Sequence, residues 1–462
     1  MEKDTRRETL FANGKNGYDR LYDGQWDIIE TYCAGYKAFL DDGKTERDCV
    51  AEAVFQAESH GFREYRPGTA VKAGDKLYIT RMGKAAAFAV IGERPLSDGI
   101  RMVAAHIDSP RLDLKPNPLY EDGGLALLKT HYYGGVKKYQ WLSLPLELRG
   151  VVCTASGGKI SVSIGADEND PVLVITDLLP HLAAEQMKKS VTDAFKGEDL
   201  NALIGSRPDE AEGADRVKLA VMALLNEKYG ITESDFVSSE LCLVPAGCAR
   251  DVGLDRAMIG AYGHDDRSCA YAALRAIFDC AAPAYTTVCF LADKEEIGSD
   301  GLTGMKSGFF DMFIESLCQG GGVSLRQCYA NSFCLSGDVC NALDPNFAGV
   351  SDKLNAARAG NGVGIFKYTG SRGKYGASDA SAETMGKLRA LLDGSGVFWQ
   401  AAELGKVDEG GGGTVAAYLA VRDIEVVDCG VPVFSMHAPF EIVSKLDCYM
   451  MYKASLAVYG DR

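Results

Sequence analysis

The stretch MVAAHID, from Met102 to Asp108, indicates how this chain is built. Its apolar residues predict a buried strand, and a histidine and an aspartate follow at the end of that strand. Open α/β sheets bind ligands outside the carboxyl ends of their strands, where a strand tip holds a side chain rigidly. The stretch therefore predicts an α/β fold with a functional site that begins at His106.

Further segments combine histidine or carboxylate residues with a preceding run that favours a strand. They are His264-Asp265-Asp266, Glu295-Glu296 after Val288–Ala292, Asp338 after Phe333–Leu335, and His437 after Val431–Phe434. Imidazole and carboxylate groups bind zinc, but the paired ligands of a zinc finger lie only roughly two to five residues apart. A single Asp or His at a strand end is more often a capping or surface residue. The joint occurrence of these segments therefore predicts a zinc site that only tertiary structure can assemble.

The middle of the chain differs from both flanks. Before it, helical patterns at 26–40 and 45–60 and strand-like runs at 76–81 and 86–92 lead to the His106 strand. Between residues 111 and 251 the pattern changes to short alternating strands, with a helical pattern at 214–228 and no metal-type cluster. Strand and helix then alternate to the end, which favours a mixed or parallel sheet covered on both faces. We predict a catalytic domain in two parts, residues 1–110 and 252–462, interrupted by a mainly β insertion at 111–251.

Composition excludes several classes of protein. The 462 residues are 47% hydrophobic and carry a net charge of −15, which argues against nucleic acid or an anionic membrane as a partner. No stretch approaches the ~20 apolar residues of a membrane span. Met1–Glu8 lacks the apolar core of a signal peptide, so we expect a cytoplasmic protein. The 14 cysteines have no paired spacing and suggest reduced core residues, although a cysteine nucleophile remains an alternative.

The motifs around the candidate ligands together resemble one family, the aspartyl aminopeptidases, which are two-zinc exopeptidases. The order and spacing match over nearly the whole chain. One departure is Asn341, which stands where some family members have a histidine, so we assign it no metal role. The motifs are His106-Ile107-Asp108-Ser109-Pro110, Asp265-Asp266-Arg267-Ser268-Cys269, Glu295-Glu296-Ile297-Gly298-Ser299, Ser336-Gly337-Asp338 with Asp344-Pro345-Asn346, and Ser435-Met436-His437.

The resemblance implies a mixed-sheet zinc-exopeptidase domain that holds two divalent ions, zinc in the first place, with cobalt or manganese as alternatives. It implies that Asp265 bridges the ions. His106 and Asp338 would complete the coordination of one ion, and Glu296 and His437 would complete that of the other. The residue types suit zinc, and two ions roughly 3.5–4 Å apart need a bridging carboxylate to relieve their repulsion.

Glu295 and Glu296 are expected to have different roles, because neighbours on an extended chain point to opposite sides. The resemblance implies that Glu295 is the general base and Glu296 a ligand. Taken alone, the pair could also be an exposed acidic start of a helix. Asp108 lies two residues after His106 and is expected to accept the other ring N–H of that histidine.

Substrate-binding residues are expected both within the insertion and in the second part of the catalytic domain. His181 resembles a family histidine that reaches into the active site of a partner subunit, and an exposed helix-start histidine is the alternative. Arg372 and Lys374 fall where family members place a basic recognition residue, and solvated loop charges are the alternative. Gly410–Gly413, with Gly411 within it, is expected to be a flexible turn whose N–H groups face a bound peptide.

The sequence thus favours a metal-dependent aminopeptidase that acts on peptides. If Arg372 or Lys374 faces the first side-chain pocket, peptides with N-terminal Asp or Glu should be preferred. A related two-metal deacylase or carboxypeptidase is an alternative, because the same metal core can hydrolyse other amides. A catalytically silent assembly subunit is another, against which the intact Glu295 and ligand set argue. The resemblance also implies a homo-oligomer built from dimers, a dodecamer, with residues 111–251 as its oligomerisation domain.

Overall fold

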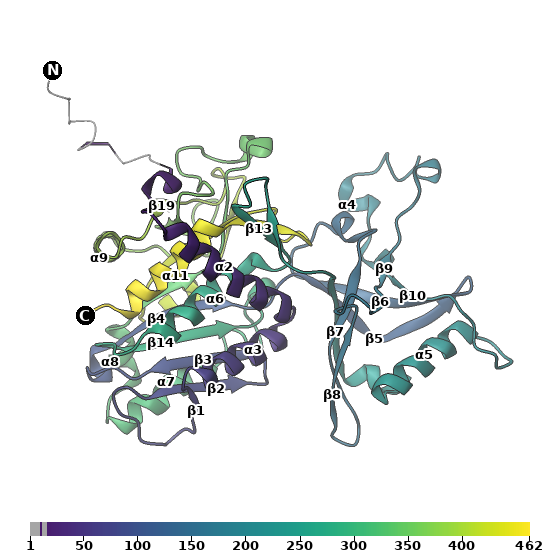
Figure 1. Ribbon diagram of the computed structural model, residues 1–462, viewed down its shortest axis with the longest axis horizontal. Helices are drawn as coiled ribbons and strands as arrows, with labels where there is room; N and C mark the ends of the chain where they lie inside the picture. Colours follow the sequence, from purple (N-terminus) through teal and green to yellow (C-terminus); the bar gives the residue numbers. More distant parts are fainter. Residues whose placement is uncertain (1–9, 12–15) are drawn as a thin grey trace.

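The chain forms two lobes in the computed structural model, which describes residues 10–11 and 16–462 (Figure 1). Met1–Glu8, on which the expected absence of a signal peptide rests, lies outside the described residues. The larger lobe contains the parts of the chain before and after the middle region, and the smaller lobe contains most of the middle region, whose last residues, Arg250 and Asp251, begin a strand of the larger lobe. None of the helices in the described part of the chain combines the length and the apolar composition that crossing a membrane requires.

A mixed nine-stranded sheet forms the centre of the larger lobe. The strands β14, β4, β15 and β21 are parallel neighbours, whereas β3 joins β14 in the antiparallel direction. The fold class predicted from the sequence is therefore confirmed. In spatial order the strands are β1 (Arg63–Glu64), β2 (Lys76–Arg81), β3 (Ala85–Val90), β14 (Thr286–Ala292), β4 (Ile100–His106), β15 (Phe333–Gly337), β21 (Glu425–Gly430), β17 (Val363–Phe366) and β19 (Trp399–Ala401).

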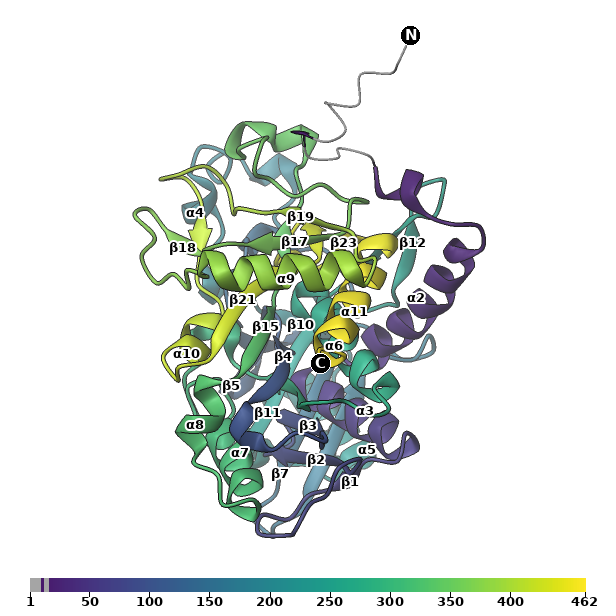
Figure 2. The same cartoon turned by 90° about the vertical axis from the view of Figure 1, so that its left-hand side faces the viewer.

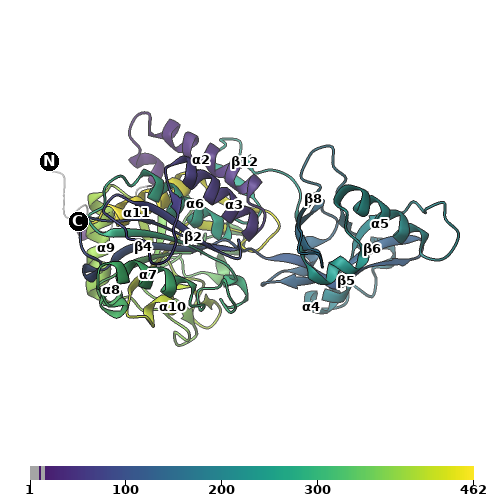
Figure 3. The same cartoon turned by 90° about the horizontal axis from the view of Figure 1, so that it is seen from below.

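Helices cover both faces of this sheet (Figure 3). Side chains of β4 alternate between the two hydrophobic cores: Val103 and Ala105 belong to one core, and Met102 and Ala104 to the other. The first core lies under α2 (Gln25–Asp42), α3 (Glu46–Ser59), α6 (His264–Asp279), α9 (Ala382–Gly394) and α11 (Lys445–Tyr459). The second lies under α7 (Phe309–Gly320), α8 (Leu325–Ala330) and α10 (Ala416–Ala420).

Local signals place the helix ends. Thr45 caps α3 by accepting a hydrogen bond from the Asp48 N–H, and the Asp48 carboxylate accepts one from the Thr45 N–H. The C-cap of α5 (Arg216–Tyr229) is Gly230, which has a φ of 70° that glycine adopts without strain. Both helices lie where the sequence predicts them.

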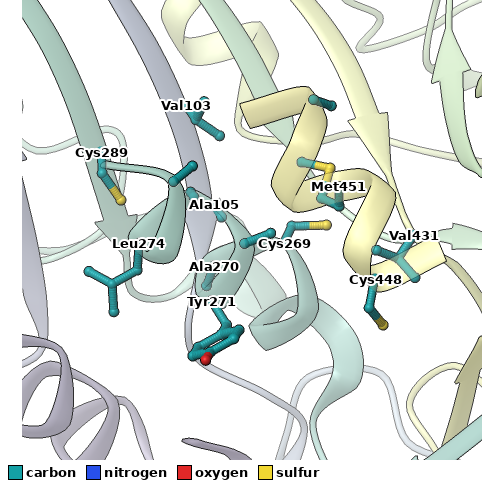
Figure 4. Close-up of a cluster of buried hydrophobic side chains, with 14 of the residues drawn as sticks. Val103, Ala105, Cys269, Ala270, Tyr271, Leu274, Cys289, Val431, Cys448 and Met451 are labelled. Atoms are coloured by element: carbon teal, nitrogen blue, oxygen red, sulfur yellow. The ribbon is translucent and has the colours of Figure 1, made fainter. Parts of the chain in front are cut away.

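The first core fixes α6, the helix that begins at the candidate site (Figure 4). Cys269 and Ala270 of α6 are fully buried near Ala105 of β4 and Met451 of α11. Small side chains allow α6 to lie close to the sheet, so a larger residue at position 270 should cost about 1–3 kcal/mol through overpacking. Meanwhile α9 and the C-terminus lie on the side of the larger lobe that faces away from the smaller lobe (Figures 1 and 2).

A second, five-stranded sheet adjoins the first within the larger lobe. Its order is β12 (Arg250–Val252), β13 (Met258–Ala261), β23 (Glu441–Ser444), β22 (Pro432–Phe434) and β16 (Cys340–Asn341). Two candidate segments, at Asp265 and His437, follow strands of this sheet. The candidate residues therefore come from two sheets.

The smaller lobe has its own sheet and its own core. All of the strand pairs in this sheet are antiparallel. Helix α5 packs against the sheet, and the core between them includes buried residues such as Trp141 and Leu243. Its strand order is β8 (Lys159–Ile164), β7 (Leu146–Cys153), β11 (Ser239–Pro245), β5 (Arg111–Asp122), β6 (Leu125–Tyr133), β10 (Ala202–Gly205) and β9 (Val174–Ile175). The role of this region in oligomerisation stays a prediction.

Candidate metal centre

Three adjacent parallel strands deliver one side of the site. His106 is the last residue of β4, and the register places it beside Ala292 at the end of β14. Glu295 begins a short 3₁₀ helix just after β14, and Asp338 follows β15 directly. Because β14, β4 and β15 are neighbours in the sheet, these side chains meet at one edge.

The five-stranded sheet delivers the other side. Asp265 lies in the first turn of α6, after β13, and His437 follows β22. The peptide bond between Asp265 and Asp266 is cis. The cluster therefore lies where segments from the two sheets meet.

Asp265 lies between the two histidines. Its Oδ1 is 3.2 Å from His106 Nε2, and its Oδ2 is 3.2 Å from His437 Nε2. Around His106, Asp338 Oδ1 is 3.9 Å and Glu295 Oε2 is 4.0 Å from the same Nε2. With one oxygen toward each imidazole, the Asp265 carboxylate could serve as a metal ligand on both sides of the cluster.

Glu296 and Asp266 add further oxygen atoms to this cluster. Glu296 Oε2 is 3.5 Å from His437 Nε2, and Glu296 also forms a compact group with His106 and Asp265. A second compact group consists of His106, Asp266 and Asp338. Asp266 was not assigned a role from the sequence. Its Oδ2 accepts a hydrogen bond from the His106 backbone N–H at 3.3 Å.

The electrostatics of the cluster favour a bound cation. Burial, followed by repulsion from neighbouring carboxylates, raises the pKa of Asp338 and of Glu296 well above the usual range. The same two causes raise the pKa of Glu295 to about 6. Among the residues that the structure describes, the buried oxygens Glu296 Oε1 and Asp266 Oδ1 also have no hydrogen-bond donor. Closely spaced carboxylates with unsatisfied oxygens, beside two imidazoles, form a ligand set suited to divalent metal ions. Such ions would supply the missing positive charge.

Asp108 holds this arrangement from behind. The carboxylate is fully buried, and its Oδ1 lies 3.3 Å from His106 Nδ1. The backbone N–H of Glu295 donates to Oδ1 at 3.1 Å, and that of Glu296 donates to Oδ2 at 3.2 Å. Tyr133 O–H also donates to Oδ2, at 2.7 Å. His106 Nδ1 is also 3.0 Å from the main-chain carbonyl oxygen of Asp108, so Asp108 lies beside the ring nitrogen with both its main chain and its carboxylate, and the carboxylate also fixes the backbone of the glutamate pair.

Glu441 is a supporting residue that the sequence reasoning missed. Its Oε2 accepts the Asp265 N–H at 3.0 Å, and its Oε1 accepts the His437 N–H at 2.7 Å. The side chain is buried, and burial together with the Asp265 charge raises its pKa to about 8. One carboxylate thus ties together the two residues supplied by the second sheet. The only sequence signal was an acidic residue at the start of an apolar strand shortly after His437.

A cavity of about 450 Å³ opens above the cluster, large enough for a small organic group. Arg372, Lys374 and Gly410–Gly413 line it together with Asp265, Glu295, Glu296, Asp338 and His437. The expected flexible turn at Gly411 is instead a two-residue strand, β20 (Gly411–Gly412), paired with β18 (Gly370–Ser371). A Cβ at Gly411 would lie 2.4 Å from the Gly370 carbonyl oxygen, which explains the glycine.

The two basic residues of this cavity differ in their surroundings. Lys374 Nζ pairs with Asp379 at 2.9 Å and lies 3.9 Å from the centre of the Tyr368 ring. The Arg372 side chain is exposed, and in the described part of the chain no side chain forms an ion pair or hydrogen bond with it. His181 lies elsewhere, in an exposed 3₁₀ helix (Pro180–Leu182) of the smaller lobe, and does not line the cavity.

Comparison with known proteins agrees with this fold. A family model described as aminopeptidase I zinc metalloprotease (M18) matches residues 39–459. A relative from Clostridium acetobutylicum, named probable M18 family aminopeptidase 1, is 48% identical over 451 residues, which are 95% of this chain and 97% of the relative. These matches define the class as zinc metalloproteases. The chain belongs to the M18 family, and it is a zinc metallo-aminopeptidase.

Solved structures have the same fold. The crystal structure of an M18 aminopeptidase from Thermotoga maritima superposes with a TM-score of 0.94 at 43% identity, covering 98% of this chain and 100% of that one. Aminopeptidase I from Clostridium acetobutylicum gives a TM-score of 0.91 at 44% identity, with 98% and 100% coverage. A dodecamer from S. cerevisiae, 19% identical, has a TM-score of 0.76 and covers 93% of this chain and 96% of that one. The family and the fold expected from the sequence are confirmed.

Proposed function

We propose that the enzyme releases N-terminal residues from peptides with two zinc ions that share Asp265. The observation that carries this proposal is the position of Asp265, with one oxygen 3.2 Å from each histidine. His106 and Asp338 would complete the site of one ion, and Glu296 and His437 that of the other. Bound zinc supplies Lewis-acid polarisation of the scissile carbonyl and a lowered pKa for the attacking water.

Glu295 has the position of the general base. Its side chain is close to the cluster and faces the cavity, and its backbone is held by Asp108. In the proposed reaction its carboxylate takes a proton from the attacking water and passes it to the leaving amine. Asp108 orients His106 through the other ring nitrogen, which keeps Nε2 directed at the cluster.

Arg372 is the better candidate for recognising an acidic first side chain. Lys374 is already paired with Asp379, whereas the Arg372 guanidinium has no carboxylate partner within the described residues. A charge-assisted hydrogen bond to a substrate carboxylate is worth roughly 1.5–3 kcal/mol. We therefore propose a preference for N-terminal Asp or Glu, with Gly411 as part of the backbone wall beside the peptide.

A panel of aminoacyl-4-nitroanilides and aminoacyl peptides tests this function. The enzyme should lose activity with a chelator and regain it with zinc, cobalt or manganese. Equal turnover with and without tightly bound metal would refute the metal mechanism. Faster cleavage of Leu or Lys substrates than of Asp and Glu substrates would refute only the acidic preference.

The smaller lobe supports the proposal of a homo-oligomer built from dimers. Around His181, several large apolar side chains are exposed, including Leu182 at 68% and Met187 at 81%. Exposed apolar clusters commonly mark protein interfaces. We propose that this surface contacts a partner subunit and brings His181 to the partner's site, in a particle that reaches the dodecamer seen for the S. cerevisiae structure.

Mixing two inactive variants tests this arrangement. A hybrid of Glu295→Gln and His181→Ala subunits should regain part of the activity, because it pairs an intact Glu295 with an intact His181 from the partner. Subunits that exchange, as shown by mass tags, yet regain no activity would place His181 outside the partner's site.

We also propose a cytoplasmic location. All fourteen cysteines are free thiols, which supports this proposal.

A further inference from the structure

The segment Tyr133–Gly135, at the end of β6 in the smaller lobe, contacts residues of the candidate metal centre through both Tyr133 and Gly135. Tyr133 is 8% exposed, and its hydroxyl donates to Asp108 Oδ2 at 2.7 Å. Two residues later, the Gly135 carbonyl lies 2.8 Å from His437 Nδ1 and accepts its hydrogen. Between them, a Cβ at Gly134 would lie 3.3 Å from Glu296 Oε2. The smaller lobe thus contacts one histidine directly and the other through Asp108.

The Tyr133 ring is held at the junction of the two lobes. Arg111 pairs with Tyr133 in the β5–β6 register, and its guanidinium carbon lies 4.0 Å from the centre of the ring. Arg111 Nη1 is also 3.2 Å from Glu46 Oε2, in α3 of the larger lobe. The ring therefore packs against a cation that is itself held in a buried ion pair. Its hydroxyl has a fixed direction, toward Asp108.

The Asp108 carboxylate depends on this hydroxyl. Without it, Oδ2 would retain one donor, the Glu296 N–H, in a fully buried place. A buried carboxylate oxygen that loses a donor is left less well satisfied, which is energetically unfavourable and favours a change in the position of the carboxylate. Any such shift would move the backbone of Glu295 and Glu296, whose N–H groups both donate to Asp108.

We propose that Tyr133 is a positioning residue through which the smaller lobe fixes the glutamate pair and His106, by way of Asp108. The inference rests on the proposed function, because it assumes that Glu295 is the base and that His106 and Glu296 are metal ligands. The insertion is therefore part of the active-site support, in addition to any role in assembly.

The variant Tyr133→Phe tests this role, because it removes the hydroxyl and keeps the ring. The matched control is Tyr78→Phe, since Tyr78 is also buried and its hydroxyl also donates to a carboxylate at 2.7 Å, that of Glu58, away from the cluster. In Tyr133→Phe we expect kcat to fall roughly 10-fold with KM changed less than about 2-fold. We also expect the zinc affinity, measured by competition with a chelator dye, to fall roughly 10-fold or more. The control should change neither quantity.

A double-mutant cycle with Asp108→Asn shows whether Tyr133 acts through Asp108. If it does, adding Tyr133→Phe to Asp108→Asn changes the zinc affinity less than about 2-fold, because the acceptor is already altered. Full additivity would refute the route through Asp108. A Tyr133→Phe enzyme that unfolds at a lower temperature but keeps wild-type kcat and zinc affinity would refute the proposal and leave Tyr133 a purely structural residue.

The zinc measurement also separates this inference from the proposed function. It needs no turnover, so a weaker zinc site in Tyr133→Phe supports the positioning role even if the tested peptides are not substrates. Conversely, a wild-type enzyme that cleaves peptides and loses activity with a chelator, beside a Tyr133→Phe enzyme that is unchanged in kcat and zinc affinity, would leave the function standing and overturn the inference.

Discussion

Replacing the two adjacent glutamates one at a time should separate the base from the metal ligand. Glu295→Gln keeps the shape of the side chain and the backbone N–H that donates to Asp108. It removes the group that accepts a proton. Since general-base catalysis contributes typically 10²–10⁴-fold, kcat should fall by that factor, which corresponds to about 3–5 kcal/mol of transition-state stabilisation.

Glu296→Gln should behave differently, because Glu296 Oε2 lies 3.5 Å from His437 Nε2 and within a compact group with Asp265 and His106. An amide oxygen is a weaker zinc ligand than a carboxylate, and the substitution removes one negative charge. We expect Glu296→Gln to lose at least one zinc ion per chain on dialysis against a mild chelator, while Glu295→Gln keeps two.

Elemental analysis of the dialysed proteins, together with kcat on one aminoacyl-4-nitroanilide, measures both effects. Circular dichroism confirms that each variant is folded. The reasoning would be refuted by metal loss in Glu295→Gln beside normal metal in Glu296→Gln, which would reverse the two roles. It would equally be refuted by a metal-loaded Glu295→Gln with nearly wild-type kcat.

Two further predictions concern specificity and stability. Arg372→Ala should lower kcat/KM for N-terminal Asp and Glu substrates by roughly 10- to 100-fold and leave Leu substrates within about 2-fold, whereas Lys374→Ala should have a smaller effect; equal losses on both substrate classes would contradict this. The Glu46 side chain is buried, with its Oε1 3.3 Å from Lys84 Nζ and its Oε2 3.2 Å from Arg111 Nη1. Burial alone would raise the pKa of Glu46, but these two cations outweigh it and lower the pKa from 4.5 to about 2. Glu46→Gln should therefore destabilise the protein by about 3 kcal/mol at neutral pH, and the difference should shrink as the pH falls from 4.5 toward 2, because only the charged carboxylate is stabilised by the fold. Thermal unfolding of both proteins across this pH range tests it, and a loss that does not change with pH would count against the ion pair as its cause.

Much of the candidate site could be predicted because its residues follow strands that the sequence marks clearly. The strand that ends at His106 is buried on both faces, so it appears as a continuous apolar run, and its end is visible where the polar residues begin. The same holds for β14 before Glu295 and for β15 before Asp338. Local sequence therefore located these side chains, and the family resemblance supplied their expected roles.

Other parts could not be predicted because they depend on contacts between distant segments. Nothing local distinguishes Tyr133 from the exposed Tyr132 beside it, and its hydroxyl is important only because β6 ends next to Asp108. Glu441 resembles an ordinary polar residue at a strand end until β22 and β23 pair and bring it under His437. The pairing of Gly411 with Ser371 likewise joins two glycine-rich segments that have no common local signal.

The division of the candidate ligands between two sheets has a consequence for folding. His106 precedes the smaller lobe in the chain, and the other candidate ligands follow it, so the cluster closes only after the two parts of the larger lobe have joined across the insertion. Carboxylates that repel one another at this junction oppose that closure, as the raised pKa of Asp338 and of Glu296 indicates. Metal ions that bind only the closed cluster would stabilise the folded state by mass action. Zinc binding and the docking of the two sheets should therefore be one coupled equilibrium. Removal of the metal should first loosen the contact between α6 and the segment around His437, and the nine-stranded sheet should unfold only under harsher conditions.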